Sequence, residues 1–207
     1  MITIVDYGLG NVQAIANIYK RLNIPVRRAS SREELAGADR IILPGVGAFD
    51  WAMTLLNQSG MRETLNELVV GERRPVLGIC VGMQMMANGS DEGVLDGLGW
   101  IAGHVNRFDV SSGVDHVRLP QMGWNDVLPQ KVDCLFQGME SEARFYFLHS
   151  YYFQAKSAED ILAVTDYHGS FASAVRSANM FGVQFHPEKS HQWGIRLLKN
   201  FAELPTC

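Results

Sequence analysis

The chain has 207 residues, 47% of them hydrophobic, so it is long enough to bury a substantial core as one domain, residues 1–207. Its formal net charge of −4 gives no electrostatic basis for nucleic-acid binding, and no apolar stretch approaches the roughly 20 residues of a membrane helix. Cys80, Cys134 and Cys207 form no close-spaced pair, which argues against a disulfide framework and a zinc site. We therefore expect a cytoplasmic protein whose thiols stay reduced.

Strand-like and helix-like segments alternate in the first half of the chain. We expect strands at 2–6, 26–29 and 41–43 and at Val76, and helices over 12–22, 49–56 and 61–70. Ser31 is expected to cap a short helix that ends at Gly37. The segment 1–6 has no basic leader and is interpreted as the first strand rather than a signal peptide. This alternation is typical of a parallel sheet with helices on both faces.

The second half of the chain has a different pattern. Closely spaced strands are expected at 99–106, 144–153, 162–166, 171–176 and 180–185, with turn residues between them. Such strands favour antiparallel additions to the sheet, followed by an amphipathic helix over 192–201. The fold class predicted from both halves is α/β, with a mixed, largely parallel central sheet flanked by helices.

The most informative motif is Gly78-Ile79-Cys80-Val81-Gly82, which follows a buried strand and precedes a helical run. The pattern G-x-C-x-G is similar to a nucleophile elbow, a strand-to-helix turn so sharp that glycine is needed on either side. A helix N-terminus at the sulfur would favour thiolate over thiol. The alternative is a buried structural cysteine beside two turn glycines.

A candidate base lies near the C-terminus, in the segment Gln184-Phe185-His186-Pro187-Glu188. In extended backbone, side chains two residues apart point to the same side, so His186 and Glu188 are expected to lie together. The carboxylate would then hold the imidazole in one tautomer, as in a catalytic triad. The alternative is a capped strand end with a solvated histidine.

No cofactor is expected. The segment Gly8-Leu9-Gly10-Asn11 follows the first strand, but Gln13 stands where a dinucleotide-binding motif has its third glycine, and no P-loop is present. A tight turn or a partner contact explains these glycines better.

Six blocks together carry a resemblance to a known family. They are Asp6-Tyr7-Gly8, Pro44-Gly45-Val46-Gly47-Ala48-Phe49, Gly78-Ile79-Cys80-Val81-Gly82-Met83-Gln84, Gly123-Trp124-Asn125, Phe145-Tyr146-Phe147-Leu148-His149-Ser150-Tyr151 and Gln184-Phe185-His186-Pro187-Glu188-Lys189-Ser190. In this order they resemble class I (triad-type) glutamine amidotransferases, and more narrowly the glutaminase subunits of imidazole glycerol phosphate synthases. The resemblance implies a flavodoxin-like three-layer sandwich.

The resemblance also implies roles for individual residues. Cys80 would attack the side-chain amide of glutamine, His186 would transfer protons and Glu188 would orient His186. The oxyanion hole would be formed by the N–H of Val81 and by the Gly45-Val46 peptide, which a flip could switch on and off. The residues implied in glutamine binding are Gly47, Gln84, His149, Ser150 and Tyr151.

A partner is implied because free ammonia is protonated at neutral pH and the chain shows no second, phosphate-binding active site. In the family the partner is a (β/α)₈-barrel synthase (cyclase) subunit, which receives ammonia and forms imidazole glycerol phosphate and AICAR in histidine biosynthesis. The residues that match partner-facing positions are Asn11, Arg118, Trp124, Tyr146 and Lys189; ordinary surface packing is the alternative. Gln121 stands where the family has histidine, and the segment 111–115 matches nothing interpretable.

Three other functions remain open at this point. A paralogue with the same chemistry would supply ammonia for amidination of surface-polysaccharide sugars. A stand-alone hydrolase with an elbow cysteine would act without a partner. A non-catalytic homologue would act as a regulator or scaffold, which an intact Cys80, His186 and Glu188 disfavour.

Overall fold

The structure is a computed structural model that describes residues 1–109, 118–139 and 143–204, so Cys207 and the segment 111–115 lie outside the described residues. Its main sheet is mixed and has ten strands, in the order β2-β1-β3-β4-β12-β11-β10-β7, with β9 beside β11 and β5 beside β9. The strands are β1 (Ile2–Val5), β2 (Val26–Ala29), β3 (Arg40–Gly45), β4 (Val76–Cys80), β5 (Gly103–Arg107), β7 (Leu128–Pro129), β9 (Tyr151–Ala155), β10 (Ile161–Asp166), β11 (Ser170–Ser177) and β12 (Met180–Val183).

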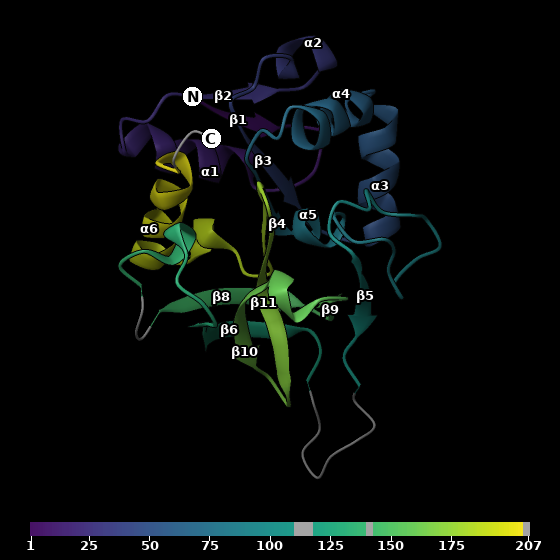
Figure 1. The fold of residues 1–207 in the computed structure, drawn as a ribbon, viewed down its shortest axis with the longest axis vertical. Coiled ribbons are helices and arrows are strands. Elements are labelled where there is room, and N and C mark those ends of the chain that lie inside the picture. Colours follow the sequence, from purple (N-terminus) through teal and green to yellow (C-terminus); the bar gives the residue numbers. More distant parts are fainter. Residues whose placement is uncertain (110–117, 140–142, 205–207) are drawn as a thin grey trace.

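Helices flank the parallel part of this sheet. Figure 1 shows α1 and α6 on one side of the strands and α3 and α4 on the other, which gives the three layers expected. The helices are α1 (Val12–Arg21), α2 (Arg32–Leu35), α3 (Phe49–Gln58), α4 (Arg62–Asn66), α5 (Val81–Gln84) and α6 (His191–Ala202). The other helical turns are the π-helical η1 (Glu67–Gly71) and the 3-10 turns η2 (Cys134–Phe136), η3 (Ala158–Asp160) and η4 (Pro187–Lys189). None of the helices in the described ranges has the length and apolar character needed to cross a membrane.

Local sequence explains why these helices form where they do. In α1 the buried residues Val12, Ile15, Ala16 and Tyr19 recur at helical spacing, so one stripe of the helix faces the sheet. The side chain of Ser31 accepts a hydrogen bond from the Glu34 N–H at the start of α2, which confirms its predicted capping role. The predicted helix over 61–70 is divided, because α4 ends at Asn66 and continues as the π-helical turn η1.

Five adjacent strands, from β2 through β1, β3 and β4 to β12, are parallel. Their register aligns the strand ends that matter for the site: Gly45 of β3 lies opposite Cys80 of β4, and Val183 of β12 lies opposite Ile79. The loops after these three strands therefore leave the sheet side by side at its carboxyl edge. In open α/β sheets this edge is where ligands bind.

The remaining strands are antiparallel, and here three predictions need correction. The predicted strand over 144–153 is two strands: β8 (Arg144–His149) pairs with β6 (Gln121–Asp126) in a separate sheet, and β9 returns to the main sheet after Ser150. The predicted strand over 99–106 begins only at Gly103, because the backbone turns at Gly99, which has a φ of +64°. The predicted strand 180–185 ends at Val183.

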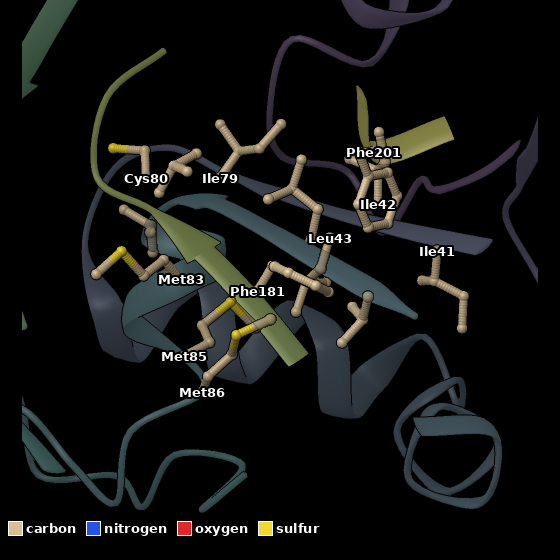
Figure 2. Close-up of a cluster of buried hydrophobic side chains, with 14 of the residues drawn as sticks. Ile41, Ile42, Leu43, Ile79, Cys80, Met83, Met85, Met86, Phe181 and Phe201 are labelled. Carbon is tan, nitrogen blue, oxygen red and sulfur yellow. The ribbon is translucent and has the colours of Figure 1, made fainter. Parts of the chain in front are cut away.

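The core beneath the carboxyl edge consists of aliphatic, methionine and aromatic side chains from the sheet and helices. Figure 2 shows Ile42, Leu43 and Phe181 packed within it, while Cys80 lies at its margin with the sulfur directed away from the cluster. The residue Cys80 is nevertheless only 3% exposed. The core thus fixes the backbone of the cysteine and leaves its sulfur for polar partners.

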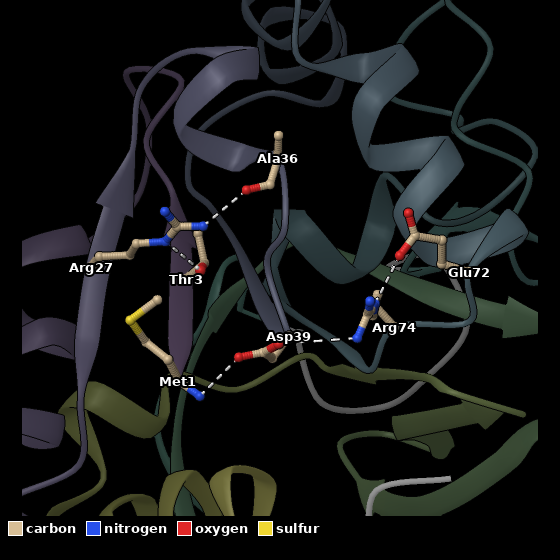
Figure 3. A network of polar contacts seen from close by, with 7 residues as sticks. All are labelled: Met1, Thr3, Arg27, Ala36, Asp39, Glu72 and Arg74. Carbon is tan, nitrogen blue, oxygen red and sulfur yellow. Dashed lines mark hydrogen bonds and ion pairs between the residues drawn. The ribbon is translucent and has the colours of Figure 1, made fainter.

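At the other edge of the sheet lies a network of polar contacts near the chain start (Figure 3). The terminal amine of Met1 pairs with Asp39 at 3.3 Å, and Arg74 pairs with Glu72 at 3.0 Å and with Asp39 at 4.0 Å. Such half-exposed ion pairs contribute little stability, typically about 0–1 kcal/mol each. We assign this network no part in chemistry.

Candidate active site

The turn at Cys80 has the geometry of a nucleophile elbow. Cys80 adopts a φ of 55° and a ψ of −113°, a combination that non-glycine residues rarely adopt. A Cβ added at Gly82 would lie 1.9 Å from the Leu43 carbonyl oxygen, and one at Gly78 would lie 2.7 Å from the Gly82 oxygen. Both flanking glycines are therefore required by close backbone packing. The helix that follows, α5, is a single turn.

The Cys80 sulfur lies near polar groups from two segments, β8 and the segment 184–188. It lies 4.0 Å from the Leu148 carbonyl oxygen and 3.8 Å from Nε2 of Gln184. Cys80 and His186 line the same cavity. The thiol and the imidazole predicted to act together are thus brought together in space.

His186 and Glu188 form the second part of the arrangement. His186 Nδ1 lies 2.9 Å from Glu188 Oε1, and the two side chains are 3% and 2% exposed. The predicted reason for their proximity is wrong, because this segment is not extended: Glu188 lies in the 3-10 turn η4, which begins at Pro187. The turn brings the carboxylate back onto the ring.

The charge balance of this pair follows from its contacts. Burial lowers the pKa of His186, but hydrogen bonds with Cys80 and Glu188 outweigh this effect and raise the pKa to about 10. Burial raises the pKa of Glu188, but its hydrogen bond with His186 and a further bond from Asn11 bring the pKa below its ordinary value. At neutral pH the imidazole therefore carries a proton beside an ionised carboxylate.

Asn11 contacts Glu188 directly. The sequence placed Asn11 at a partner-facing position, and in the structure its Nδ2 donates a hydrogen bond of 2.6 Å to Glu188 Oε1. That oxygen thus accepts from both Asn11 and His186, while Glu188 Oε2 is buried without a partner among the described residues. Asn11 is therefore well placed to fix the orientation of the carboxylate.

A cavity of about 350 Å³ lies in front of the sulfur. It brings together most of the residues that the sequence singled out; those lining it are Asn11, Val46, Gly47, Cys80, Val81, Gln84, His149, Ser150, Tyr151, His186 and Lys189. Gly45 is not in the lining, but a Cβ built on it would lie 2.5 Å from the Gly82 nitrogen. The two segments predicted to form the oxyanion hole are thus packed against each other.

The polar side chains of the cavity wall are oriented by backbone carbonyls. Gln84 Nε2 donates to the Tyr151 carbonyl oxygen and to Gln184 Oε1, both at 3.1 Å. His149 Nδ1 lies 2.7 Å from the same carbonyl oxygen of Tyr151, which fixes the proton on Nδ1. Burial lowers the pKa of His149 to about 4, so its Nε2 is an unprotonated acceptor at neutral pH.

Four residues at the site were missed by the sequence analysis as site residues. Glu92, Pro120 and Leu148 line the cavity, and Gln184 contacts the sulfur. Gln184 was part of a motif block, and its position two residues before His186 could have indicated that it lies near the site. Glu92 gave no such signal because the loop that carries it has no motif, and Leu148 contributes only a backbone carbonyl.

Four of the five predicted partner-facing residues are near one another. The Lys189 ammonium lies 5.5 Å from the centre of the Tyr146 ring, and the Trp124 and Tyr146 ring centres are 6.3 Å apart. Trp124, which is 41% exposed, also stacks on His191 at 5.2 Å. Arg118 is exposed, and within the described ranges the ring contacts that join Trp124, Tyr146 and Lys189 do not extend to it.

A larger cavity, of about 670 Å³, lies between residues 129 and 137. It contains Cys134, but burial and the neighbouring Asp133 raise the pKa of that thiol. Asp133 is itself paired with Arg176. A protonated thiol is a poor nucleophile, so Cys80 rather than Cys134 is the candidate nucleophile among the described cysteines.

The chain is similar to known proteins over nearly its full length. The model of the class I glutamine amidotransferase family matches residues 3–204. A relative from Bdellovibrio bacteriovorus, named imidazole glycerol phosphate synthase subunit HisH, is 59% identical over 99% of this chain and 100% of its own. Another relative of that name, from Leptospira interrogans, is 47% identical over the same shares of the two chains.

Solved structures support the fold. A crystal structure of a glutamine amidotransferase superposes with a TM-score of 0.74 at 20% identity, covering 98% of this chain and 97% of the other. PurLQS from Thermotoga maritima gives a TM-score of 0.69 at 18% identity, covering 97% and 96%. The chain belongs to the class I glutamine amidotransferase family.

Proposed function

We propose that this chain is the glutaminase subunit of an imidazole glycerol phosphate synthase. It hydrolyses glutamine to glutamate and ammonia, and the ammonia is used by a synthase partner in histidine biosynthesis. The observation that carries this proposal is that a strained elbow cysteine shares one cavity with His186, which is paired with the buried Glu188, in a chain 59% identical to a subunit of that name.

The reaction proposed for the site has two halves. The Cys80 sulfur attacks the side-chain carbonyl carbon of glutamine, and His186, which is protonated at rest, gives its proton to the departing nitrogen. The C–N bond breaks, ammonia leaves and a glutamyl thioester remains on Cys80. His186 then takes a proton from water, which attacks the thioester and releases glutamate. The free thiolate and a protonated His186 are restored.

We assign the developing oxyanion to the N–H of Val81 and to the Gly45-Val46 peptide. The segments are in contact, since a Cβ on Gly45 would lie 2.9 Å from the Val81 carbonyl carbon. One donor of this kind typically contributes ~3 kcal/mol in the transition state. A peptide flip at Gly45-Val46 would remove one donor and so is proposed as the on–off switch.

Binding of the glutamine substrate is assigned to the opposite wall of the cavity. Gln84 uses both of its N–H hydrogens within the protein, so it has only its carbonyl oxygen to offer to an N–H of the substrate. Glu92 adds a carboxylate to the lining, which complements an ammonium group. Gly47 and the segment 149–151 supply the backbone that we propose binds the amino-acid head group.

The synthase partner is proposed to be a (β/α)₈-barrel subunit that docks over the mouth of the cavity. Asn11 and Lys189 line the cavity, and Lys189 also contacts Tyr146, so the proposed docking surface is continuous with the site. Lys189 directly follows the triad residue Glu188 in η4. We further propose that residues 1–207 act as one glutaminase domain in the cytoplasm, where a catalytic thiol stays reduced.

The test uses the complex with the barrel partner and the variant Cys80→Ala. Glutamine-dependent formation of imidazole glycerol phosphate is expected to be lost, while ammonia-dependent formation persists, because the acceptor site lies on the partner. Cys134→Ala, a cysteine outside the cavity, is the matched control and should retain both activities. Glutamine-dependent synthesis by Cys80→Ala, or product formation only on a different acceptor, would overturn the assignment.

A further inference from the structure

We propose that Gln184 stabilises the Cys80 thiolate by donating an amide N–H to the sulfur, and that Gln84 holds Gln184 in the donating orientation. This inference rests on the proposed role of Cys80 as the nucleophile. It gives Gln184 a function in catalysis that is distinct from those of the triad residues.

Gln184 is rigidly held beside the sulfur. It directly follows β12, and its backbone N–H donates a hydrogen bond of 2.9 Å to the Ser173 carbonyl oxygen. The residue is 0% exposed, so water does not compete for its amide. Its Nε2 lies 3.8 Å from Cys80 Sγ, a distance suited to an N–H···S hydrogen bond.

A chain of contacts fixes which end of the Gln184 amide faces the sulfur. The backbone carbonyl of Tyr151 can only accept, so the Gln84 atom 3.1 Å from it must be the donor Nε2. That same Nε2 lies 3.1 Å from the Gln184 amide and therefore needs an acceptor there, which is Oε1. The nitrogen of Gln184 is then left facing Cys80.

A fixed N–H donor acts differently on the two states of the sulfur. A thiolate accepts a hydrogen bond more strongly than a neutral thiol, because it carries the charge. The Leu148 carbonyl, 4.0 Å away on another segment, can only accept and so favours the protonated thiol. Gln184 is therefore placed to offset this carbonyl and to favour the reactive form.

Gln84 links this donor to the substrate cavity. It lines the cavity, and it reaches the sulfur through only one further side chain, Gln184. A substrate that contacts Gln84 therefore contacts the side chain that orients Gln184. The amides of Gln84 and Gln184 connect the substrate to the Cys80 sulfur by a route that does not involve His186 or Glu188.

The test measures the rate at which iodoacetamide alkylates Cys80 as a function of pH, in the full chain, with the labelled cysteine identified by peptide mass. Gln184→Met keeps a similar volume and removes the side-chain amide. The pH of half-maximal alkylation is expected to rise by about one unit, because one hydrogen bond to a charged group is lost. Ser173→Ala removes a buried hydroxyl without a partner among the described residues, on the neighbouring strand, and should leave the profile unchanged.

Gln184→Glu tests which end of the side chain faces the sulfur. Glutamate keeps the volume and the oxygen that accepts from Gln84, and it puts a carboxylate oxygen where Nε2 stands, so the profile would stay close to that of the unmodified chain only if this end did not face Cys80. The proposed geometry predicts a larger rise than in Gln184→Met, because the carboxylate lacks the N–H and also repels the thiolate. This variant also carries the test if Gln184→Met does not fold.

An unchanged profile in both variants would overturn the inference, as would a shift in Gln184→Met alone. These outcomes are separate from failure of the proposed function. If Cys80→Ala retained glutaminase activity, Cys80 would not be the nucleophile. If Cys80→Ala were inactive and the two Gln184 profiles were unchanged, only the role of Gln184 would be wrong.

Discussion

His186 lies between the proposed nucleophile, Cys80, and the proposed orienting group, Glu188, and both affect its pKa. Its Nδ1 is 2.9 Å from Glu188, whose Oε1 also accepts from Asn11 at 2.6 Å. The interactions with Cys80 and Glu188 keep the ring protonated despite its burial. The protonated His186 is thus held in one orientation by the Glu188 carboxylate, and Asn11 holds that carboxylate in place.

These contacts predict that substitutions of His186 and Glu188 lower kcat by different amounts. His186→Ala removes the proton carrier, and kcat is expected to fall by about 10³-fold. Glu188→Gln should lower kcat less, by about 10²-fold, because Asn11 still fixes the side-chain oxygen that accepts from Nδ1. Steady-state glutaminase assays of the complex measure both, with Glu203→Gln, an exposed glutamate, as the control. A loss in Glu188→Gln equal to that in His186→Ala would argue against an orienting role.

His149 predicts a dependence of stability on pH. Its pKa falls from 6.5 to about 4 because it is buried. Between these values the unfolded chain binds a proton that the folded chain does not, so His149 destabilises the fold as pH falls from 6.5 towards 4. The full effect is at most about 3 kcal/mol.

Urea unfolding at pH 7 and pH 4 measures this contribution. His149→Asn keeps an N–H donor for the Tyr151 carbonyl but does not titrate, so it should lose less stability on acidification than the unmodified chain. His168→Asn is the control, because His168 is exposed and its positive φ of 55° suits asparagine. Equal acid sensitivity of the unmodified chain and His149→Asn would show that His149 is not the cause.

At the scale of elements, the elbow depends on close packing between β3, β4 and α5. A Cβ at Gly82 would meet the Leu43 oxygen at 1.9 Å, and this backbone atom of a central strand cannot move without disturbing the sheet. Gly82→Ala is therefore expected to reduce the free energy of unfolding by about 3 kcal/mol or more.

The matched control for this substitution is Gly71→Ala. Gly71 is at the end of η1 and has no atom within 4 Å of an added Cβ, so the change should cost little. Urea denaturation gives both values. Similar midpoints for Gly82→Ala and the unmodified chain would contradict the tight elbow.

The parallel strands and the elbow could be predicted because their signals are local. Apolar runs mark β1, β3 and β4, and the glycines at 78 and 82 mark the turn. The break of the segment 144–153 at Ser150 could not be predicted, since both halves alternate like a strand and only tertiary pairing assigns them to different sheets. β6 was missed because Gly123, Asn125 and Asp126 have low strand propensity.

The candidate site, like the fold, could be predicted only where its signals are local in the sequence. Motifs identified the residues of the cavity wall, but not the contacts between side chains distant in sequence. The bond from Asn11 to Glu188 spans 177 positions, and the position of Gln184 beside Cys80 depends on the register of β12 with β4. Such contacts become visible only when the strands are placed.

At the scale of the whole molecule, the proposed docking surface lies next to the triad on β6, β8 and η4. Trp124 is 41% exposed there, stacked on His191. Exposed aromatic residues of this kind are often the main contributors to binding in an interface. Trp124→Ala is therefore expected to weaken binding to the barrel partner by about 2 kcal/mol, or about thirtyfold in Kd.

Isothermal titration of the full chain with the partner measures this change. Trp51→Ala is the matched control, because Trp51 is 54% exposed on α3, an element outside the proposed surface, and its Kd should be unchanged. A Trp124→Ala variant that binds as tightly as the unmodified chain would place the interface elsewhere.

The central claim is that Cys80 forms a covalent bond to the glutamine side chain. The most direct measurement is labelling with a glutamine analogue that carries a chloromethyl ketone in place of the amide, followed by peptide mass analysis. The account predicts that Cys80 is labelled, that excess glutamine protects it, and that activity is lost in proportion to labelling. Loss of activity with Cys80 unlabelled, or labelling of Cys134 at the same rate without protection by glutamine, would contradict it.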